Sequence, residues 1–248
     1  MITRKTPEQI ALMRRAGRVV AEIHEKVREA ARPGTTTAEL DLVAREVLDR
    51  RGARSNFFNY HGFPATICTS PNHVIVHGIP GDVRIAEGDI LSVDAGAIVE
   101  GWHADAAVTF PIGEVDEESV RLMDVTRRSL EEAIKQAVPG NRIGDVGWAV
   151  ESICEEAGYG LVREYVGHGI GTAMHEDPQI PNYGPPGRGM KIQEGHVFAF
   201  EPMINRGSGA TRLLDDGWTV VTADGARSAH FEHTVAVTEH GPEVLTVP

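Results

Sequence analysis

The stretch ILSVDAGAIVEGWHADAAVTF, residues 90–110, is the part of this 248-residue chain that decides its fold class. Two apolar runs flank Glu100-Gly101, so a β-hairpin is expected with these two residues as its turn. Asp105 then lies opposite Gly96, which makes Asp94 and Asp105 diagonal neighbours on one face. Two carboxylates on a half-buried face repel each other and are costly to desolvate. A divalent cation between them is the simplest remedy, and a pair that faces water is the alternative.

Outward from this hairpin, helical and extended patterns alternate along the chain. Thr6-Pro7-Glu8-Gln9 predicts a capped helix start, and Pro33-Gly34 ends the apolar helical pattern that follows. Further helices are predicted from Thr36 to Arg51-Gly52, over about 117–137 and over about 145–156. Short apolar runs predict strands within about 66–110, 160–167, 196–204, 217–222 and 230–238.

The order of these elements predicts the architecture. Hairpin-linked strands with helices collected apart are typical of an α+β protein with a largely antiparallel sheet. The two halves of the chain, about 1–115 and 116–248, repeat this order of elements without a repeat in the letters. No Pro/Ser-rich linker separates them, so we expect a single domain over 1–248.

Composition narrows the class of function. With 24 Lys and Arg against 36 Asp and Glu, the net charge is −12, which argues against a large nucleic-acid footprint. No stretch approaches the ~20 apolar residues of a membrane helix, and the start MITRKTPEQI lacks the apolar run of a signal peptide. Cys68 and Cys154 form no CxxC motif and fit a reducing compartment. We therefore expect a cytoplasmic protein with no nucleic-acid or membrane partner.

Two further carboxylates lie inside apolar, strand-like segments. HVFAFEPMI, residues 196–204, holds Glu201, and AHFEHTVAV, residues 229–237, holds Glu232. A Glu that is fully buried and unpaired is rare, so each could be paired with an Arg. Four acids in four apolar strands nevertheless make one shared metal site more economical than four separate salt bridges.

Histidines beside glycines add to this candidate site. VGHGIGTAMHE, residues 166–176, places His168 between glycines that let the backbone approach a ligand closely. His175 follows seven residues later, which is not the HExxH spacing. His77 ends the strand-like VIVHGIP. A single histidine of this kind is more often structural than catalytic, but three beside glycines at strand ends favour a site.

The types of ligand indicate the chemistry. Four carboxylates and one imidazole suit hard or borderline divalent ions such as Mn, Fe, Co or Zn. Two such ions ~3.5–4 Å apart can ionise a shared water and hold both ends of a displacement reaction. The sequence has no Walker loop, no GxSxG motif and no GxGxxG after a strand, and no particular His is placed beside Cys68. A two-metal hydrolase is the favoured class.

Five segments together resemble the metal-site segments of the methionine aminopeptidases, in the order found in that family. They are VHGIP (76–80), DAGAIVEGWHAD (94–105), GHGIGTAMHEDP (167–178), FAFEPM (198–203) and FEHT (231–234). The resemblance covers nearly the whole chain. It implies the pita-bread fold, in which two pseudo-symmetric halves place helices outside a curved, mostly antiparallel sheet.

The resemblance also implies which residues bind metal. Two divalent ions (Co, Mn, Fe or Zn) would be held by Asp94, Asp105, His168, Glu201 and Glu232. Asp105 and Glu232 resemble the bridging carboxylates of the family. Asp94 resembles the ligand of the metal that also receives the free amine of the substrate.

Roles in catalysis and substrate binding are implied in the same way. His77 and His175 resemble the two histidines that contact the scissile amide, and Glu201 resembles the carrier of the proton of the attacking water. The segments that line the methionine pocket correspond to Tyr60, Phe63, Cys68, His77, Met174, His175 and Trp218. An unbranched methionine suits a slot of rings and sulfur. At the position of Met174 the family pattern leads us to expect an aromatic residue.

The short chain resembles the type I enzymes of bacteria, because no Cys/His-rich zinc-binding extension precedes Met1 and no long insertion separates the halves. The expected function is removal of the N-terminal methionine from nascent proteins and peptides whose second residue is small. Two alternatives stay open: an Xaa-Pro aminopeptidase or prolidase-like enzyme, and a non-catalytic pita-bread binding module. A monomer is the expected state. The physiological metal and any contact with the ribosome are left open.

Overall fold

The computed structural model describes residues 2–248, and a large antiparallel sheet organises this part of the chain. Its strand order is β1-β4-β5-β14-β9-β7-β8, and β2 and β15 add to β4 and β14. The strands are β1 (Arg54–Ser55), β2 (Ile67–Pro71), β4 (Ile90–Val99), β5 (Trp102–Pro111), β7 (Gly167–Gly169), β8 (Glu176–Ile180), β9 (Val197–Phe200), β14 (Glu232–Thr238) and β15 (Gly241–Val244).

Two smaller sheets of three strands each flank the large one. The first has the order β13-β10-β6 and the second the order β11-β12-β3. Their strands are β3 (Val74–Val76), β6 (Gly160–Leu161), β10 (Met203–Asn205), β11 (Thr211–Leu213), β12 (Val220–Thr222) and β13 (Ser228–His230). A short 3₁₀ turn, η1 (Tyr60–Gly62), lies in the loop between β1 and β2.

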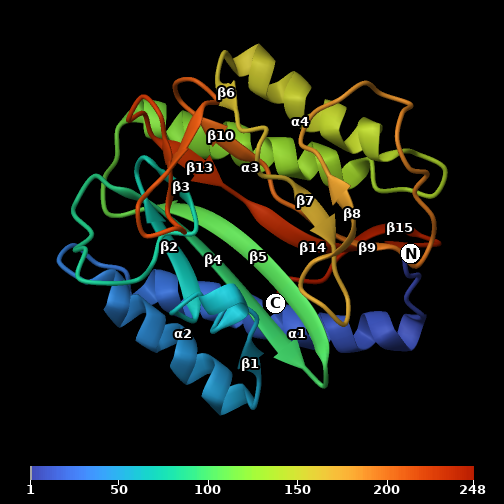
Figure 1. Ribbon diagram of the computed structural model, residues 1–248, viewed down its shortest axis with the longest axis horizontal. Coiled ribbons are helices and arrows are strands. Elements are labelled where there is room, and N and C mark those ends of the chain that lie inside the picture. The colour runs from blue at the N-terminus through green and yellow to red at the C-terminus, as the bar shows by residue number, and fades with distance from the viewer. Residues whose placement is uncertain (1) are drawn as a thin grey trace.

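Two pairs of helices lie outside the curved large sheet. Figure 1 shows α1 (Pro7–Ala30) and α2 (Thr37–Arg51) below it, and α3 (Glu117–Lys135) and α4 (Ile143–Ala157) above it. Each half of the chain thus contributes one helix pair. This arrangement confirms the predicted α+β class and the pita-bread architecture.

The first two helices begin as their sequences predict. The side chains of Thr6 and Thr36 each accept a hydrogen bond from the backbone N–H of the third helical residue. The side chains of Gln9 and Glu39 in turn accept from the backbone N–H of Thr6 and Thr36, which completes a capping box at each helix. The second helix ends at Gly52, whose φ of 62° is in the left-handed region that glycine adopts without strain.

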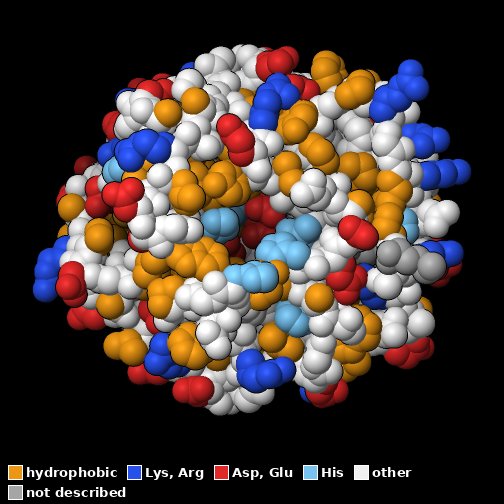
Figure 2. Space-filling view, viewed as in Figure 1, with side chains coloured by type: hydrophobic (Ala, Val, Ile, Leu, Met, Phe, Trp, Pro, Cys, Tyr) orange, Lys and Arg blue, Asp and Glu red, His pale blue; other side chains and the backbone are white. Residues whose placement is uncertain are grey.

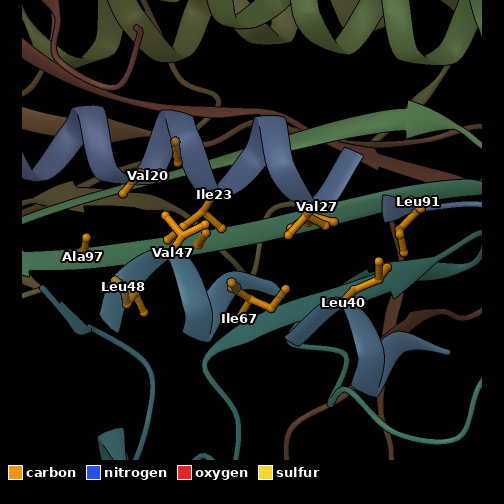
Figure 3. Close-up of a cluster of buried hydrophobic side chains, with 14 of the residues drawn as sticks. Val20, Ile23, Val27, Leu40, Val47, Leu48, Ile67, Leu91 and Ala97 are labelled. Carbon is orange, nitrogen blue, oxygen red and sulfur yellow. The ribbon is translucent and has the colours of Figure 1, made fainter. Parts of the chain in front are cut away.

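Each helix pair packs its apolar face on strands of its own half. Val20, Ile23 and Val27 of α1 meet Leu40 and Val47 of α2 over β2, β4 and β5 (Figure 3). A second cluster joins α3 and α4 to β9 and β14 on the other side. Burial of each such side chain contributes about 1.5–3 kcal/mol, so these clusters fix the sheet that carries the site.

The central hairpin has the predicted register. β4 and β5 pair along their whole length, with Gly96 opposite Asp105. The turn residues Glu100 and Gly101 have φ values of 51° and 82°, the left-handed pair that a two-residue turn of type I′ requires. Because side chains alternate between the two faces of a strand, Asp94 and Asp105 share one face.

Two predicted strands are broken where the sequence reads as continuous. The strand predicted over 196–204 is divided into β9 and β10, which belong to different sheets, because Pro202 cannot donate a ladder hydrogen bond. The strand predicted over 160–167 is divided in the same way: β6 pairs with β10, and β7 pairs with β9. The prediction of single strands was wrong at both places.

The remaining predictions of element bounds need only small shifts, such as the start of α4 at Ile143 instead of 145 and of β12 at Val220 instead of 217. Among residues 2–248, no helix combines the length and the apolar character needed to cross a lipid bilayer.

Candidate active site

One row of cross-strand neighbours forms the floor of the candidate site. Cys68 of β2 pairs with Asp94 of β4, Asp94 pairs with Ala107 of β5, and Ala107 pairs with Glu232 of β14. Directly opposed residues in an antiparallel sheet present their side chains on the same face. The methyl group of Ala107 leaves open the space between the carboxylates of Asp94 and Glu232.

A second row lies beside the first. His168 of β7 pairs with Ala199 of β9, which pairs with Thr234 of β14. The Thr234 hydroxyl accepts a hydrogen bond from the backbone N–H of Asp105 at 3.0 Å and lies 3.3 Å from its Oδ1. The regular ladder therefore brings His168 and Asp105 toward each other from strands more than 60 residues apart in sequence.

The glycines around His168 are required by close backbone packing. A Cβ atom on Gly167 would lie 2.3 Å from the carbonyl oxygen of Ala199, and one on Gly169 would lie 2.2 Å from that of Asp177. These distances are far inside van der Waals contact. The glycines therefore allow close approach between neighbouring strands, and a close approach to a ligand remains a prediction.

Glu201 reaches the same face from the break between β9 and β10. Its Oε1 lies 3.6 Å from Nε2 of His168, and its Oε2 lies 3.9 Å from Nε2 of His230. Asn182 donates a hydrogen bond from its side chain to the backbone carbonyl of Glu201 at 3.1 Å, which holds this irregular segment. We call the set Asp94, Asp105, His168, Glu201 and Glu232 the acidic wall.

The acidic wall concentrates negative charge away from water. Ligand atoms of Asp105, His168 and Glu232 lie within 4.8 Å of one another. Among the described residues, no Lys or Arg side chain forms an ion pair with any of the four acids. Oδ1 of Asp94 is buried without a hydrogen-bond partner in this part of the chain. Such groups are costly to bury unless a positive charge accompanies them.

The pKa values of the four acids reflect this environment. Burial raises the pKa of Asp105 to about 7. Burial, together with the neighbouring carboxylates, raises the pKa values of Asp94, Glu201 and Glu232 well above their usual range. Each acid thus resists ionisation unless a cation compensates it.

His168 is oriented as a metal ligand. Its Nδ1 lies 2.9 Å from the backbone carbonyl of Gly169, which accepts the Nδ1 proton. The free Nε2 lone pair then points at the acids, 3.6 Å from Glu201 and 3.8 Å from Asp105. Burial lowers the pKa of His168 to about 4, so the ring is neutral near pH 7. A fixed tautomer of this kind is typical of histidines that bind metal.

The donor set therefore fits divalent metal ions. Four oxygen donors and one nitrogen suit Mn, Fe, Co or Zn, and the acids carry enough charge for two dications. A positive ion bound between the carboxylates would explain both the Asp94 oxygen without a hydrogen-bond partner and the raised pKa values.

An apolar wall formed by Phe57, Phe63, Cys68, Met174 and Trp218 also lines the site, and Cys68 joins it to the acids because it pairs with Asp94. Phe63 makes edge-to-face contacts with Trp218, at 5.1 Å between ring centroids, and with Phe57, at 6.4 Å. The two walls enclose one cavity of about 150 Å³. Figure 2 shows it as a hollow with acidic groups inside, surrounded by histidine and hydrophobic side chains.

Tyr60, His77 and His175 also line the cavity, so the structure gathers every predicted site residue around it. His175 makes an edge-to-face contact with His168, with 4.3 Å between ring centroids, and the ring centroids of His77 and Trp218 are 6.4 Å apart. Burial lowers the pKa of His77 to about 4, so its ring is a neutral hydrogen-bonding group near pH 7. The roles assigned to these residues remain predictions.

Burial also decides the state of the cavity cysteine. Removal from water, with the charge of Asp94 beside it, raises the pKa of Cys68 well above its usual range. The thiol is therefore protonated near pH 7 and is a poor nucleophile. It acts here as an apolar lining group where the two walls meet.

Four residues near the site were not identified from the sequence. They are Phe57, Asn182, His230 and Thr234. Thr234 could have been found, because it shares the inward face of its strand with Glu232. Phe57 and Asn182 lie outside the strands, in loops without periodicity, so no sequence pattern marks them.

Comparison with known proteins agrees with this geometry. The sequence pattern of metallopeptidase family M24 matches residues 11–239 of this chain. The chain is 48% identical over 248 residues to the methionine aminopeptidase of Clostridium acetobutylicum, covering 100% of this chain and 99% of the relative. It is 46% identical over 246 residues to methionine aminopeptidase 1 of Bacillus subtilis, covering 99% of each.

Solved structures show the same relationship. The methionine aminopeptidase of Thermotoga maritima superposes with a TM-score of 0.98 at 44% identity, over 100% of both chains. A prolidase from Pyrococcus furiosus shares the fold with a TM-score of 0.80 at 23% identity, but this chain covers only 65% of it. With a family match over most of its length and full-length relatives at 46–48% identity, the chain belongs to metallopeptidase family M24.

Proposed function

We propose that this protein is a dinuclear metallo-aminopeptidase that removes the N-terminal methionine from peptides and nascent proteins whose second residue is small. The observation that carries the proposal is the pairing of two walls in one cavity. Five side chains that we assign as metal ligands line the same cavity as an apolar wall of rings and sulfur. The full-length relatives are named methionine aminopeptidases, which supports the same assignment.

In this proposal the acidic wall holds two divalent ions. Asp105 and Glu232 would contribute to both ions, His168 and Glu201 would hold one of them, and Asp94 would hold the other. When bound, the ions polarise the scissile carbonyl and lower the pKa of an attacking water. The free α-amine of the substrate would also be received by the ion held by Asp94.

The other groups of the chain orient the peptide and move protons. The carboxylate of Glu201 takes a proton from the attacking water and delivers it to the leaving amine. Glu201 suits this exchange because its carboxylate lies at the edge of the acidic wall, 3.6 Å from His168, where an attacking water would be held. His77 and His175 donate hydrogen bonds to the scissile amide, where they stabilise charge that develops in the transition state.

The apolar wall selects the first side chain. Phe63 and Met174 are 3% and 5% exposed, so this wall excludes water and offers no charged partner. An unbranched apolar side chain fits such a slot, whereas a β-branched or charged one does not. Because an apolar slot discriminates by only ~1–3 kcal/mol per methylene, norleucine should remain a usable substitute.

A panel of tripeptides tests the proposal with Mn²⁺ or Co²⁺ present and, in parallel, with a chelator. We expect cleavage of Met-Ala-Ser and norleucyl-Ala-Ser, little cleavage of Val-Ala-Ser, and none of formyl-Met-Ala-Ser, because a formylated nitrogen cannot bind beside Asp94. The chelator should stop all cleavage. If Ala-Pro-Ala were the best substrate, the protein would be a proline-directed relative. If no peptide were cleaved with either metal, it would be a binding module.

We also propose that the protein works as a cytoplasmic monomer on chains emerging from the ribosome. The net charge of −12 and the absence of a bilayer-crossing helix among residues 2–248 are compatible with this setting. Sedimentation velocity of the metal-loaded protein tests the oligomeric state, and co-sedimentation with ribosomes tests the contact.

A further inference from the structure

A hydrogen bond between two side chains that line the cavity joins the two halves of the chain. The hydroxyl of Tyr60 lies 2.8 Å from Nδ1 of His175, and their ring centroids are 5.5 Å apart. Tyr60 comes from the turn η1 before β2, and His175 precedes β8. The two residues are 115 positions apart in sequence, so only the folded structure brings them together.

The turn that carries Tyr60 holds an unusual conformation. Asn59 and His61, on either side of it, have φ values of 63° and 49°. Left-handed backbone at non-glycine residues is unfavourable and persists only where the surrounding structure imposes it, often at functional sites. Backbone bonds from Asn59 to Phe63 and from Tyr60 to Phe57, both 2.8 Å, close the turn. The direction in which the Cα–Cβ bond of Tyr60 points is thereby fixed.

The chemistry of the two groups decides what the bond does. A phenol keeps its proton near neutral pH and can donate it in a hydrogen bond. A neutral imidazole carries one proton, so a ring that accepts a bond at Nδ1 must carry its proton at Nε2. His175 packs 4.3 Å from the ring of His168 of the acidic wall. The N–H of His175 is then available on the reacting side of the cavity.

We propose that Tyr60 is a positioning residue whose hydroxyl donates to Nδ1 of His175, which fixes the ring and places its only N–H at Nε2, toward the carbonyl oxygen of the bound peptide. This inference rests on the proposed function and deepens it. It gives the hydroxyl of Tyr60 a role in the chemical step, separate from the contact of its ring with the methionine side chain.

A double-mutant cycle on the metal-loaded enzyme tests the inference. Tyr60→Phe keeps the ring and removes only the hydroxyl. We expect kcat for Met-Ala-Ser to fall roughly 10–100-fold, the range for partners that orient histidines in metal sites. KM should stay within about twofold, since the apolar wall is intact, and metal content by elemental analysis should not change. In a His175→Ala background, Tyr60→Phe should lower kcat by less than about twofold, because the hydroxyl has nothing left to orient.

Tyr159→Phe is the matched control. The hydroxyl of Tyr159 donates to Glu118 of α3, and neither residue lines the cavity, so its loss should leave kcat unchanged. The inference is overturned if Tyr60→Phe lowers kcat by the same factor with and without His175, or if it raises KM and leaves kcat intact. Wild-type cleavage of Met-Ala-Ser is measured in the same assay. Failure of the proposed function would therefore appear as an inactive wild type, and failure of this inference as an additive cycle.

Discussion

The acidic wall and the apolar wall line one cavity, yet they are built differently. Asp94, Asp105 and Glu232 project from β4, β5 and β14, three adjacent strands in regular register. The apolar wall takes most of its side chains from turns and loops, such as the segment around η1 and the loop that ends at Met174. Three of the four acids that repel each other thus lie on regularly hydrogen-bonded strands, whereas most groups of the apolar wall lie in turns and loops.

The difference follows from the energetics of the two walls. Buried like charges separate unless many backbone hydrogen bonds and a packed core hold them, and the large sheet supplies both. Apolar groups attract one another without directional requirements, so a loop is sufficient to present them. A change in the acidic wall should therefore abolish chemistry, whereas a change in the apolar wall should alter the preference for substrate.

The largest effect is expected from removal of one acid. Asp105→Ala or Glu201→Ala should abolish measurable turnover and lower the metal content, because each removes charge that holds two dications together. Elemental analysis and the Met-Ala-Ser assay measure both. Asp124→Asn, which removes an exposed charge of α3, is the control and should leave both unchanged. Two metals per chain with full activity in Asp105→Ala would contradict its role as a bridging ligand.

A smaller loss is expected at His175, which lies between the walls. His175→Ala should lower kcat by on the order of 10²–10³, the typical effect of losing one preorganised hydrogen-bond donor. Metal content should stay at the wild-type level, since the residue is predicted to contact the substrate and not the metal. Loss of metal in this variant would make His175 a ligand and change the coordination scheme.

The apolar wall should respond in specificity. Trp218→Ala removes the ring that packs edge-on against Phe63 and widens the slot. We expect kcat/KM for Met-Ala-Ser to fall roughly 10–200-fold, equal to ~1–3 kcal/mol of binding, mainly through KM. Bulkier first residues should gain relative to methionine, with metal content unchanged. An equal loss for every peptide in the panel would show that Trp218 serves the chemical step instead.

The smallest expected effect is on stability and concerns the metal-free protein. Its buried acids have folded-state pKa values above the unfolded value near 4, with Asp105 at about 7, so the folded chain binds more protons than the unfolded chain. Stability should therefore fall as the pH rises through that range. Buried histidines act in the opposite direction, since burial lowers the pKa of His168 to about 4 and that of His230 to about 3. Their contribution rises from about pH 3–4 and levels off above the unfolded value near 6.5, so only a small part of the rise remains above pH 7.

The free energy of unfolding of the metal-free protein, measured in urea at pH 7 and at pH 8, reports mainly on the protonation of the acids. We expect the free energy of unfolding to fall by roughly 1–3 kcal/mol, since one net proton changes it by about 1.4 kcal/mol per pH unit. Asp94→Asn should reduce this fall, and added Mn²⁺ should abolish it. A free energy of unfolding that rises from pH 7 to pH 8 would show that the four acids are ionised without metal.

Much of this molecule could be predicted from the sequence, because its signals are local. Capping boxes at Thr6 and Thr36, the turn at Glu100-Gly101 and the alternation along β14 depend on neighbours a few residues away. The acids were conspicuous because they interrupt apolar strands, where a solvated charge has no place. Resemblance in five short segments then connected them to one family.

Only the tertiary structure decided the rest. It set Asp94, Ala107 and Glu232 in one row, divided the predicted strand at Pro202 and brought Tyr60 to His175. These relations depend on the register between strands and on the path of loops, where contacts join residues far apart in the chain. Alternation of side chains shows which face a residue takes, but only packing fixes what lies across from it.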